Sequence, residues 1–170
     1  MNIVLIGMRG AGKTTVAKKV AEKLSRPFIE MDDLIVEKEQ MKIPEIVEKH
    51  GWDYFRDLES EVASEVATKE NVVISAGGGI VTRPENILAL KKNGVIVFLQ
   101  VSVDELLKRI GDDPNRPYLA GKKTVREDME EVSEERKNLY LSSADEIVDT
   151  NNKSVDDVVI DALEKVKGKI

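Results

Sequence analysis

One glycine-rich run near the start of the chain constrains the fold more than any other feature. Residues 7–14 have the sequence Gly-Met-Arg-Gly-Ala-Gly-Lys-Thr, which matches the pattern G-x-x-x-x-G-K-[ST] in full. The run follows a short apolar stretch at residues 3–6 and precedes apolar residues at helical spacing from Lys13 to Leu24. A loop between a strand and a helix can direct its backbone amides and the helix N-terminus at phosphate oxygens. The sequence therefore predicts a phosphate-binding loop (P-loop).

The chemistry of the loop residues predicts a triphosphate ligand with a magnesium ion. Lys13 is placed to reach the β- and γ-phosphates, and the Thr14 hydroxyl is a predicted Mg²⁺ ligand. The ligand is expected to be Mg-ATP, because the chain contains no Asn-Lys-x-Asp motif of the kind that GTPases use to recognise the base. The ATP-binding residues predicted in this run are Gly10, Ala11, Gly12, Lys13, Thr14 and Thr15.

Apolar runs alternate with amphipathic stretches along the rest of the chain, which indicates an α/β fold with a mainly parallel sheet. The runs are continuous rather than alternating, which is typical of strands that helices cover on both faces. The five predicted strands lie at residues 3–6, 27–31, 72–75, 95–99 and 146–148.

Several helices are predicted from their start signals. Four of them begin with Ser or Thr followed three residues later by an acid, so that side chains can satisfy the free amides of the first turn. The pairs are Thr82 with Glu85, Ser102 with Glu105, Thr124 with Glu127, and Ser154 with Asp157. Residues 32–69 are predicted to be helical with breaks near Pro44 and Gly51, whereas residues 111–123 contain Gly and Pro with little periodicity and predict a flap.

Composition narrows the class of protein. The 170 residues fit one domain, predicted to span residues 1–170, and the net charge of −6 argues against nucleic acid as the main partner. Cysteine is absent, which excludes disulfides and thiol chemistry. The apolar start is too short for a membrane span or a signal peptide, so no membrane partner and a cytoplasmic location are expected.

Four further segments stand out beside the P-loop as candidates for the acceptor side of the site. Each one alone has an ordinary explanation: an Arg-x-x-Glu pair is usually a solvated surface pair, and a glycine triplet can be a simple turn. The segments are residues 28–32 with Glu30 and Asp32, residues 54–59 with Arg56 and Glu59, the triplet Gly77, Gly78 and Gly79, and residues 115–119 followed by 136–140, with Arg116 and Arg136.

Together with the P-loop, these segments resemble the shikimate kinase family over nearly the whole chain, in order and spacing. The resemblance implies a five-stranded parallel sheet flanked by helices, the P-loop fold of the nucleoside monophosphate kinase type. It also implies a substrate-binding helical region at about residues 32–60 and a lid at about residues 111–123. The implied activity is transfer of the γ-phosphate of ATP to the 3-hydroxyl of shikimate, in the pathway to chorismate and aromatic amino acids, and a monomer is expected.

The resemblance also implies roles for single residues. Arg56 and Arg136 would bind the shikimate carboxylate, since a guanidinium pairs with a carboxylate through two parallel hydrogen bonds. Asp32 would orient the attacking hydroxyl, and Lys13, Asp32 and Arg116 are the predicted catalytic residues. The glycines at positions 77–79 would border the substrate, and Arg109, Arg116 and Lys153 would lie near the nucleotide.

One departure from the family pattern concerns the metal. The first acid of the segment at residues 28–32 is usually Asp but is Glu30 here, which is predicted to hold Mg²⁺ through a water, with Asp33 as a rival.

Two other functions compete with shikimate phosphorylation. A gluconate-type or nucleotide kinase would share the sheet and the P-loop. A catalytically silent binding module would be expected to have lost Lys13, Asp32 or an arginine that grips the carboxylate, but all of these are present.

Overall fold

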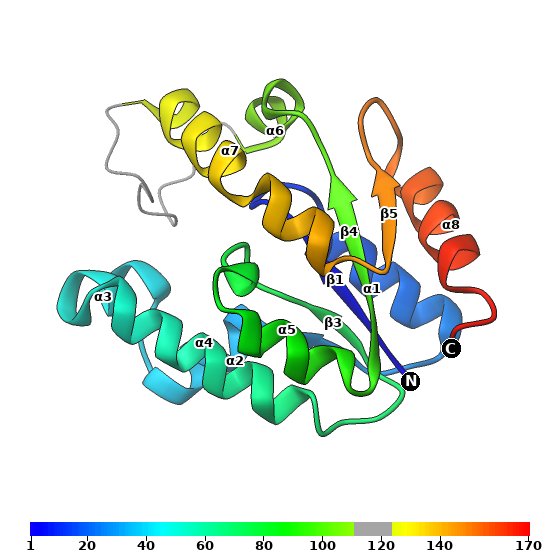
Figure 1. The fold of residues 1–170 in the computed structure, drawn as a ribbon, viewed down its shortest axis with the longest axis horizontal. Helices are drawn as coiled ribbons and strands as arrows, with labels where there is room; N and C mark the ends of the chain where they lie inside the picture. The colour runs from blue at the N-terminus through cyan, green and yellow to red at the C-terminus, as the bar shows by residue number, and fades with distance from the viewer. Residues whose placement is uncertain (111–123) are drawn as a thin grey trace.

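A five-stranded parallel sheet lies at the centre of the structure, a computed structural model that describes residues 1–110 and 124–170 (Figure 1). The strand order is β2-β3-β1-β4-β5, and every neighbouring pair is parallel. The strands are β1 (Asn2–Ile6), β2 (Phe28–Glu30), β3 (Val73–Ser75), β4 (Gly94–Gln100) and β5 (Glu146–Asp149). The predicted α/β fold and all five predicted strands are therefore confirmed.

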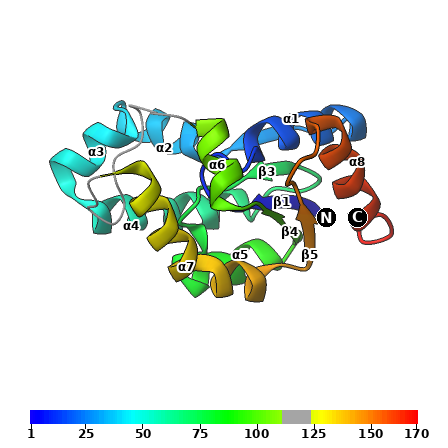
Figure 2. The same ribbon diagram turned by 90° about the horizontal axis from the view of Figure 1, so that it is seen from above.

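Helices cover both faces of this sheet. Viewed from above, α1 and α8 lie side by side on one face, and α5 and α7 lie on the other (Figure 2). The helices are α1 (Lys13–Leu24), α2 (Met31–Glu39), α3 (Ile43–His50), α4 (Trp52–Val66), the 3₁₀ helix η1 (Ile80–Thr82), α5 (Pro84–Lys91), α6 (Val103–Ile110), α7 (Val125–Ser143) and α8 (Val155–Val166). Within the described residues, no helix is long and apolar enough to cross a membrane.

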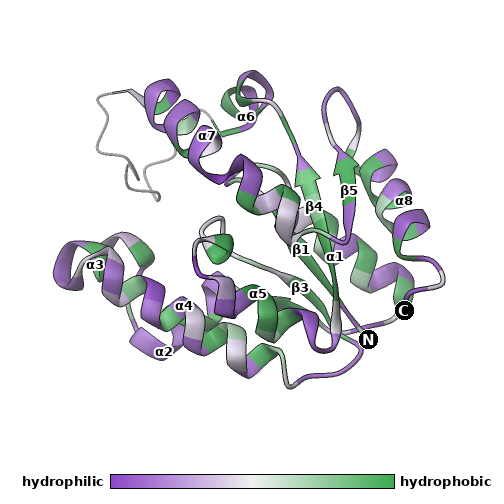
Figure 3. Cartoon of the chain, viewed as in Figure 1, coloured by the Kyte–Doolittle hydropathy of each residue, from purple (hydrophilic) through white to green (hydrophobic). Residues whose placement is uncertain are grey.

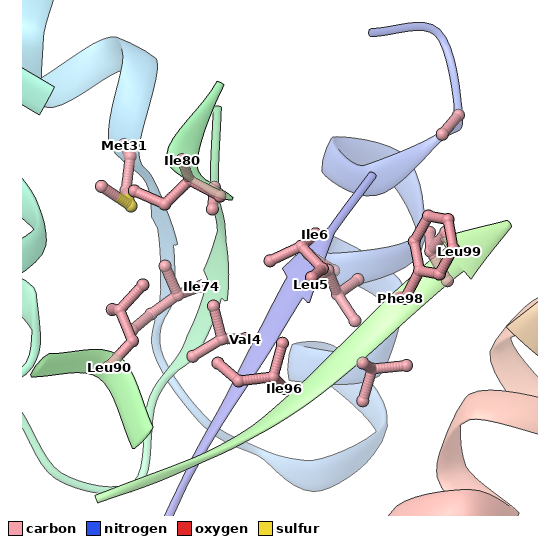
Figure 4. Close-up of a cluster of buried hydrophobic side chains, with 14 of the residues drawn as sticks. Val4, Leu5, Ile6, Met31, Ile74, Ile80, Leu90, Ile96, Phe98 and Leu99 are labelled. Carbon is pink, nitrogen blue, oxygen red and sulfur yellow. The ribbon is translucent and has the colours of Figure 1, made fainter. Parts of the chain in front are cut away.

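The core lies between the sheet and these helices. All five residues of β1 are buried, as are the first six of β4, which explains the continuous apolar runs at residues 3–6 and 95–99. Side chains such as Leu5, Ile74 and Ile96 form this core (Figure 4), and the hydrophilic residues lie mainly on the outer faces of the helices (Figure 3).

Three of the four predicted helix starts are confirmed. The Ser102, Thr124 and Ser154 hydroxyl oxygens accept hydrogen bonds from the backbone N–H groups three residues later, at 3.3, 3.1 and 3.1 Å. The start at Thr82 is wrong, because α5 begins at Pro84 and the Thr82 hydroxyl donates to the Gly79 carbonyl at 2.7 Å. Proline suits the first helical turn and disfavours helical backbone in the residue before it, so the helix cannot start earlier.

The predicted helical region after β2 consists of α2, α3 and α4. The first break lies at residues 40–42, just before Pro44, which occupies the first turn of α3. The second break is at Gly51, whose φ of +87° favours glycine. The predicted flap at residues 111–123 lies outside the described residues.

Candidate active site

The P-loop joins the carboxyl end of β1 to the first turn of α1, as its sequence predicts. Gly10 and Gly12 have φ angles of +80° and +91°, which favour glycine and let the backbone of the loop curl tightly. The Lys13 ammonium lies inside this curl and donates to the Gly7 and Met8 carbonyls at 2.8 and 2.9 Å. The loop therefore holds the Lys13 ammonium against its own backbone carbonyls.

Two adjoining pockets open at this end of the sheet. The first, called here the phosphate pocket, is lined by Arg9, Gly10, Gly12, Lys13, Thr14, Thr15, Glu30, Asp32, Ser75, Ala76, Gly77, Gly78 and Arg109. The second, called here the arginine pocket, is lined by Met8, Arg9, Asp32, Ile43, Trp52, Phe55, Arg56, Glu59, Gly77, Gly78, Gly79 and Arg136. Arg9, Asp32, Gly77 and Gly78 line both, so they form the wall between the pockets.

On one side of the arginine pocket, α4 supplies Arg56 and Glu59 as a buried ion pair. Their side chains are 14% and 1% exposed, and Arg56 Nη1 lies 2.8 Å from Glu59 Oε2. The ordinary reading of this pair as a solvated surface contact is therefore wrong. Burial raises the pKa of Glu59, although the neighbouring Arg56 charge opposes the rise. The Arg56 guanidinium also lies 5.2 Å from the centre of the Trp52 ring, which adds a cation–π contact.

The glycine triplet gives this guanidinium its space. A Cβ atom at Gly79 would lie 2.0 Å from Arg56 Nη1, and one at Gly77 would lie 2.5 Å from Glu59 Oε1. Any side chain at either position would displace the buried pair. The triplet is therefore more than a flexible turn, because it makes room for the charged groups of the arginine pocket.

Arg136 enters the same pocket from α7, on the opposite side. Its side chain is buried, and a Cβ atom at Gly78 would lie 3.6 Å from its Nη1 atom. One turn further along α7, the buried Tyr140 hydroxyl donates to the Gly78 carbonyl, and the Tyr140 ring stacks on Phe98 at 5.0 Å. The contacts of α7 therefore fix both a guanidinium and the glycine loop that faces it.

Glu30 ends β2 and faces the phosphate pocket. The Thr14 hydroxyl donates to Glu30 Oε2 at 2.6 Å, so the longer side chain reaches the predicted metal ligand directly. Burial raises the pKa of Glu30, the Thr14 hydrogen bond opposes the rise, and the Asp32 charge adds to it. A hydroxyl and a carboxylate on this wall fit Mg²⁺, which prefers oxygen ligands. Asp33 is exposed and lines neither pocket.

The predicted nucleotide-side residues divide into three groups. Arg109 lines the phosphate pocket and donates to the Thr150 carbonyl at 2.9 Å and to the Ala11 carbonyl at 3.3 Å. Lys153 pairs with Asp161 at 2.8 Å and lines a separate hollow beside β5 and α8, which shares no lining residue with the phosphate pocket. Arg116 lies outside the described residues.

Two residues of the site escaped the reasoning from sequence. Arg9, at a variable position of the P-loop, lines both pockets, and Tyr140 supports Gly78 from α7. The only sequence signal for Arg9 is a cation within a loop of mostly small residues. Tyr140 gives no such signal, because a tyrosine on a helix usually packs in a core.

Comparison with known proteins shows the family of the chain. The family model described as shikimate kinase matches residues 9–167. The chain belongs to the shikimate kinase family. A curated shikimate kinase of Caldanaerobacter subterraneus is 42% identical over 171 residues, which cover 99% of each chain. A solved shikimate kinase of Acinetobacter baumannii, in complex with shikimate, superposes with a TM-score of 0.94 and 34% identity, covering 99% of this chain and 93% of that one.

A more distant structure bears on the competing function of a gluconate-type kinase. A gluconokinase of Sinorhizobium meliloti matches with a TM-score of 0.61 and 20% identity, covering 97% of this chain and 90% of that one. At this identity the likeness shows a shared fold alone. The shikimate kinase family thus accounts for the sequence and the fold together.

Proposed function

We propose that this member of the shikimate kinase family transfers the γ-phosphoryl group of ATP to the 3-hydroxyl of shikimate, giving shikimate 3-phosphate and ADP. The observation that carries the proposal is the wall that the arginine pocket shares with the phosphate pocket, with Asp32 on it. A carboxylate-bearing acceptor held by Arg56 and Arg136 would present its hydroxyls to Asp32, next to the γ-phosphate. The reaction belongs to the pathway to chorismate and aromatic amino acids.

ATP would bind along the P-loop. Backbone amides of the loop and the Lys13 ammonium would hold the phosphates, and Arg109 lies on the same pocket wall. Lys13 would exchange its bonds to the Gly7 and Met8 carbonyls for phosphate oxygens. Lys153 does not line this pocket, and its contact with the nucleotide stays a proposal that rests on the family resemblance.

Thr14 and Glu30 would hold Mg²⁺ on the same side. The ion, when bound, supplies positive charge that offsets the negative charge of the triphosphate. Glu30 accepts the Thr14 hydrogen bond and thereby leaves a lone pair of the Thr14 oxygen available to a cation. Glu30 thus keeps the hydroxyl correctly oriented.

Shikimate would bind in the arginine pocket with its carboxylate between Arg56 and Arg136. Two guanidinium groups suit a carboxylate because each can donate two parallel N–H groups to it. Glu59 fixes the orientation of Arg56 through the 2.8 Å ion pair. This ion pair supports the proposal, because it would orient Arg56 before the substrate arrives.

The transfer itself needs positioning and charge more than covalent participation of the protein. The bond from the γ-phosphorus to the bridging oxygen of ADP breaks, and a bond from phosphorus to the shikimate 3-oxygen forms. Asp32 orients the hydroxyl and is a carboxylate on the shared wall that can accept its proton. Arg116, which we propose as a further cation on the phosphates, lies outside the described residues.

The remaining parts of the proposal concern context. We expect a monomer in the cytoplasm that acts on small molecules, with neither a membrane nor a nucleic acid as a partner. A single domain with a substrate-binding region at about residues 32–60 and a lid at about residues 111–123 is part of the same proposal. Gluconate also carries a carboxylate, so it is the acceptor that an experiment must exclude.

The decisive experiment measures ADP release from Mg-ATP with and without shikimate, with gluconate and nucleoside monophosphates as parallel acceptors. Turnover that depends on shikimate is the expected result. Turnover only with another acceptor would keep a P-loop kinase and reject shikimate as the substrate. Nucleotide binding without any phosphorylated product would instead support the silent binding module.

A further inference from the structure

Arg9 occupies an unusual place in the site. Of the four residues that line both pockets among the described parts of the chain, it is the single cation, and Asp32 is the single anion. The shared wall is where a phosphoryl group passes from the nucleotide to the acceptor. Arg9 therefore places positive charge beside the path of the transferred group.

The side chain of Arg9 is held in place by the start of α7. Its Nη2 atom lies 3.4 Å from Asp128 Oδ2, and its Nε donates to Met129 Sδ at 3.4 Å. The Arg9 side chain is 10% exposed and that of Asp128 is fully buried. A guanidinium fixed in this way loses little conformational freedom when an anion binds, which is the arrangement that favours charge stabilisation.

The backbone of Arg9 also borders the glycine loop. A Cβ atom at Gly78 would lie 3.5 Å from the Arg9 backbone nitrogen and 3.6 Å from Arg136 Nη1. Gly78 therefore lies between the P-loop and the arginine that we assign to the acceptor carboxylate.

Charge explains why a cation is needed here. Before transfer, the acceptor hydroxyl beside Asp32 is neutral; afterwards it carries a phosphate of about two negative charges next to the same carboxylate. Lys13 remains with the P-loop and the phosphates of ADP. We propose that Arg9, oriented by Asp128, binds the phosphoryl group as it arrives on the acceptor, and so discriminates the phosphorylated product from the substrate.

This inference rests on the proposed function, and the sole tryptophan provides an assay for both. Trp52 lines the arginine pocket and lies 5.2 Å from the Arg56 guanidinium, so its fluorescence should report ligand binding. Dissociation constants for shikimate and for shikimate 3-phosphate would be measured on the full chain. The variants are Arg9→Met, Arg9→Lys and Asp128→Asn, with Arg126→Met as the control. Arg126 is half exposed on the same turn of α7 and pairs only with surface carboxylates in the described chain.

For Arg9→Met we expect about tenfold or greater loss of affinity for shikimate 3-phosphate and less than about threefold loss for shikimate, because a hydrogen bond to a charged group is removed from the product alone. Arg9→Lys should restore part of the loss. Asp128→Asn should weaken product binding by less than Arg9→Met does, since the guanidinium retains its charge but loses the carboxylate that orients it. Arg126→Met should leave both constants unchanged.

The inference is overturned if Arg9→Met and Asp128→Asn lose affinity for both ligands equally, so that the ratio of the dissociation constants for shikimate and shikimate 3-phosphate stays unchanged. That pattern would make the ion pair a structural link between the P-loop and α7, and thermal unfolding of each variant would show the matching loss of stability. Failure of the unmodified protein to bind shikimate would instead overturn the proposed function, and this inference with it.

Discussion

Substitution of Gly79 by alanine tests the arginine pocket most directly. The Gly79 backbone has φ of −91° and ψ of 5°, a conformation that alanine can adopt. The new Cβ atom would lie 2.0 Å from Arg56 Nη1, whereas ordinary van der Waals contact begins near 3.4 Å. The Arg56 guanidinium must therefore retreat by about 1.4 Å, the difference between these distances.

The retreat should cost substrate affinity more than it costs the fold. Glu59 is 1% exposed and packed against Gly77, so it cannot follow Arg56, and the 2.8 Å contact between them lengthens. Loss of a hydrogen bond to a charged group costs about 1.5–3 kcal/mol, equivalent to about a tenfold to hundredfold rise in the shikimate KM. The ATP KM should stay close to its original value. Stability should fall by less than the roughly 3–5 kcal/mol that follows complete removal of one partner of a buried pair.

A double-mutant cycle with Arg56→Ala identifies the cause. Both KM values and the urea unfolding midpoint would be measured for Gly79→Ala, Arg56→Ala and the double variant. If alanine at position 79 acts by displacing Arg56, it should have little further effect on the shikimate KM once Arg56 is absent. Additive effects on the shikimate KM would refute this reasoning, as would an unchanged KM in Gly79→Ala.

Three other perturbations test the rest of the site. Lys13→Ala should reduce turnover about a hundredfold or more with the fold retained by circular dichroism, and near-normal turnover would contradict the P-loop assignment. In the absence of Mg²⁺, the stability of the Glu30→Gln variant relative to the unmodified protein should increase as pH rises. Because the pKa of Glu30 is raised in the folded protein, its contribution to the free energy of unfolding is complete below the ordinary glutamate pKa and is lost as pH rises through the raised value. Urea unfolding midpoints that change in parallel for the variant and the unmodified protein from pH 4 to 7 would contradict this. Tyr140→Phe should lower the free energy of unfolding by about 1–3 kcal/mol, because the Gly78 carbonyl loses a buried donor; unchanged urea unfolding would show that this hydrogen bond contributes nothing.

The errors of sequence reasoning follow from what neighbouring residues can specify. The Thr82 start failed because Pro84, two positions later, constrains the backbone more strongly than a capping side chain does. The Arg56–Glu59 pair looked like a surface contact because spacing on a helix does not reveal which face is buried. The proposed contact of Lys153 with the nucleotide stays a prediction; in the structure Lys153 pairs with Asp161 on α8.

The sequence by itself determined the features that depend on adjacent residues. The P-loop is eight consecutive residues between a strand and a helix, and three helix starts depend on hydrogen bonds that span three residues. The continuous apolar runs also determined the parallel sheet, because only strands covered on both faces need them. The resemblance to the shikimate kinase family came from the order of such local segments.

The tertiary structure alone decided which distant residues meet. Arg56 on α4 and Arg136 on α7 face one pocket, and Arg9 pairs with Asp128 across 119 positions of the chain. Burial then sets the chemistry of these groups: it raises the pKa of Glu30 and Glu59 and holds Arg9 in place. Local preferences cannot encode these effects, since desolvation and charge pairing arise only when separate elements pack together.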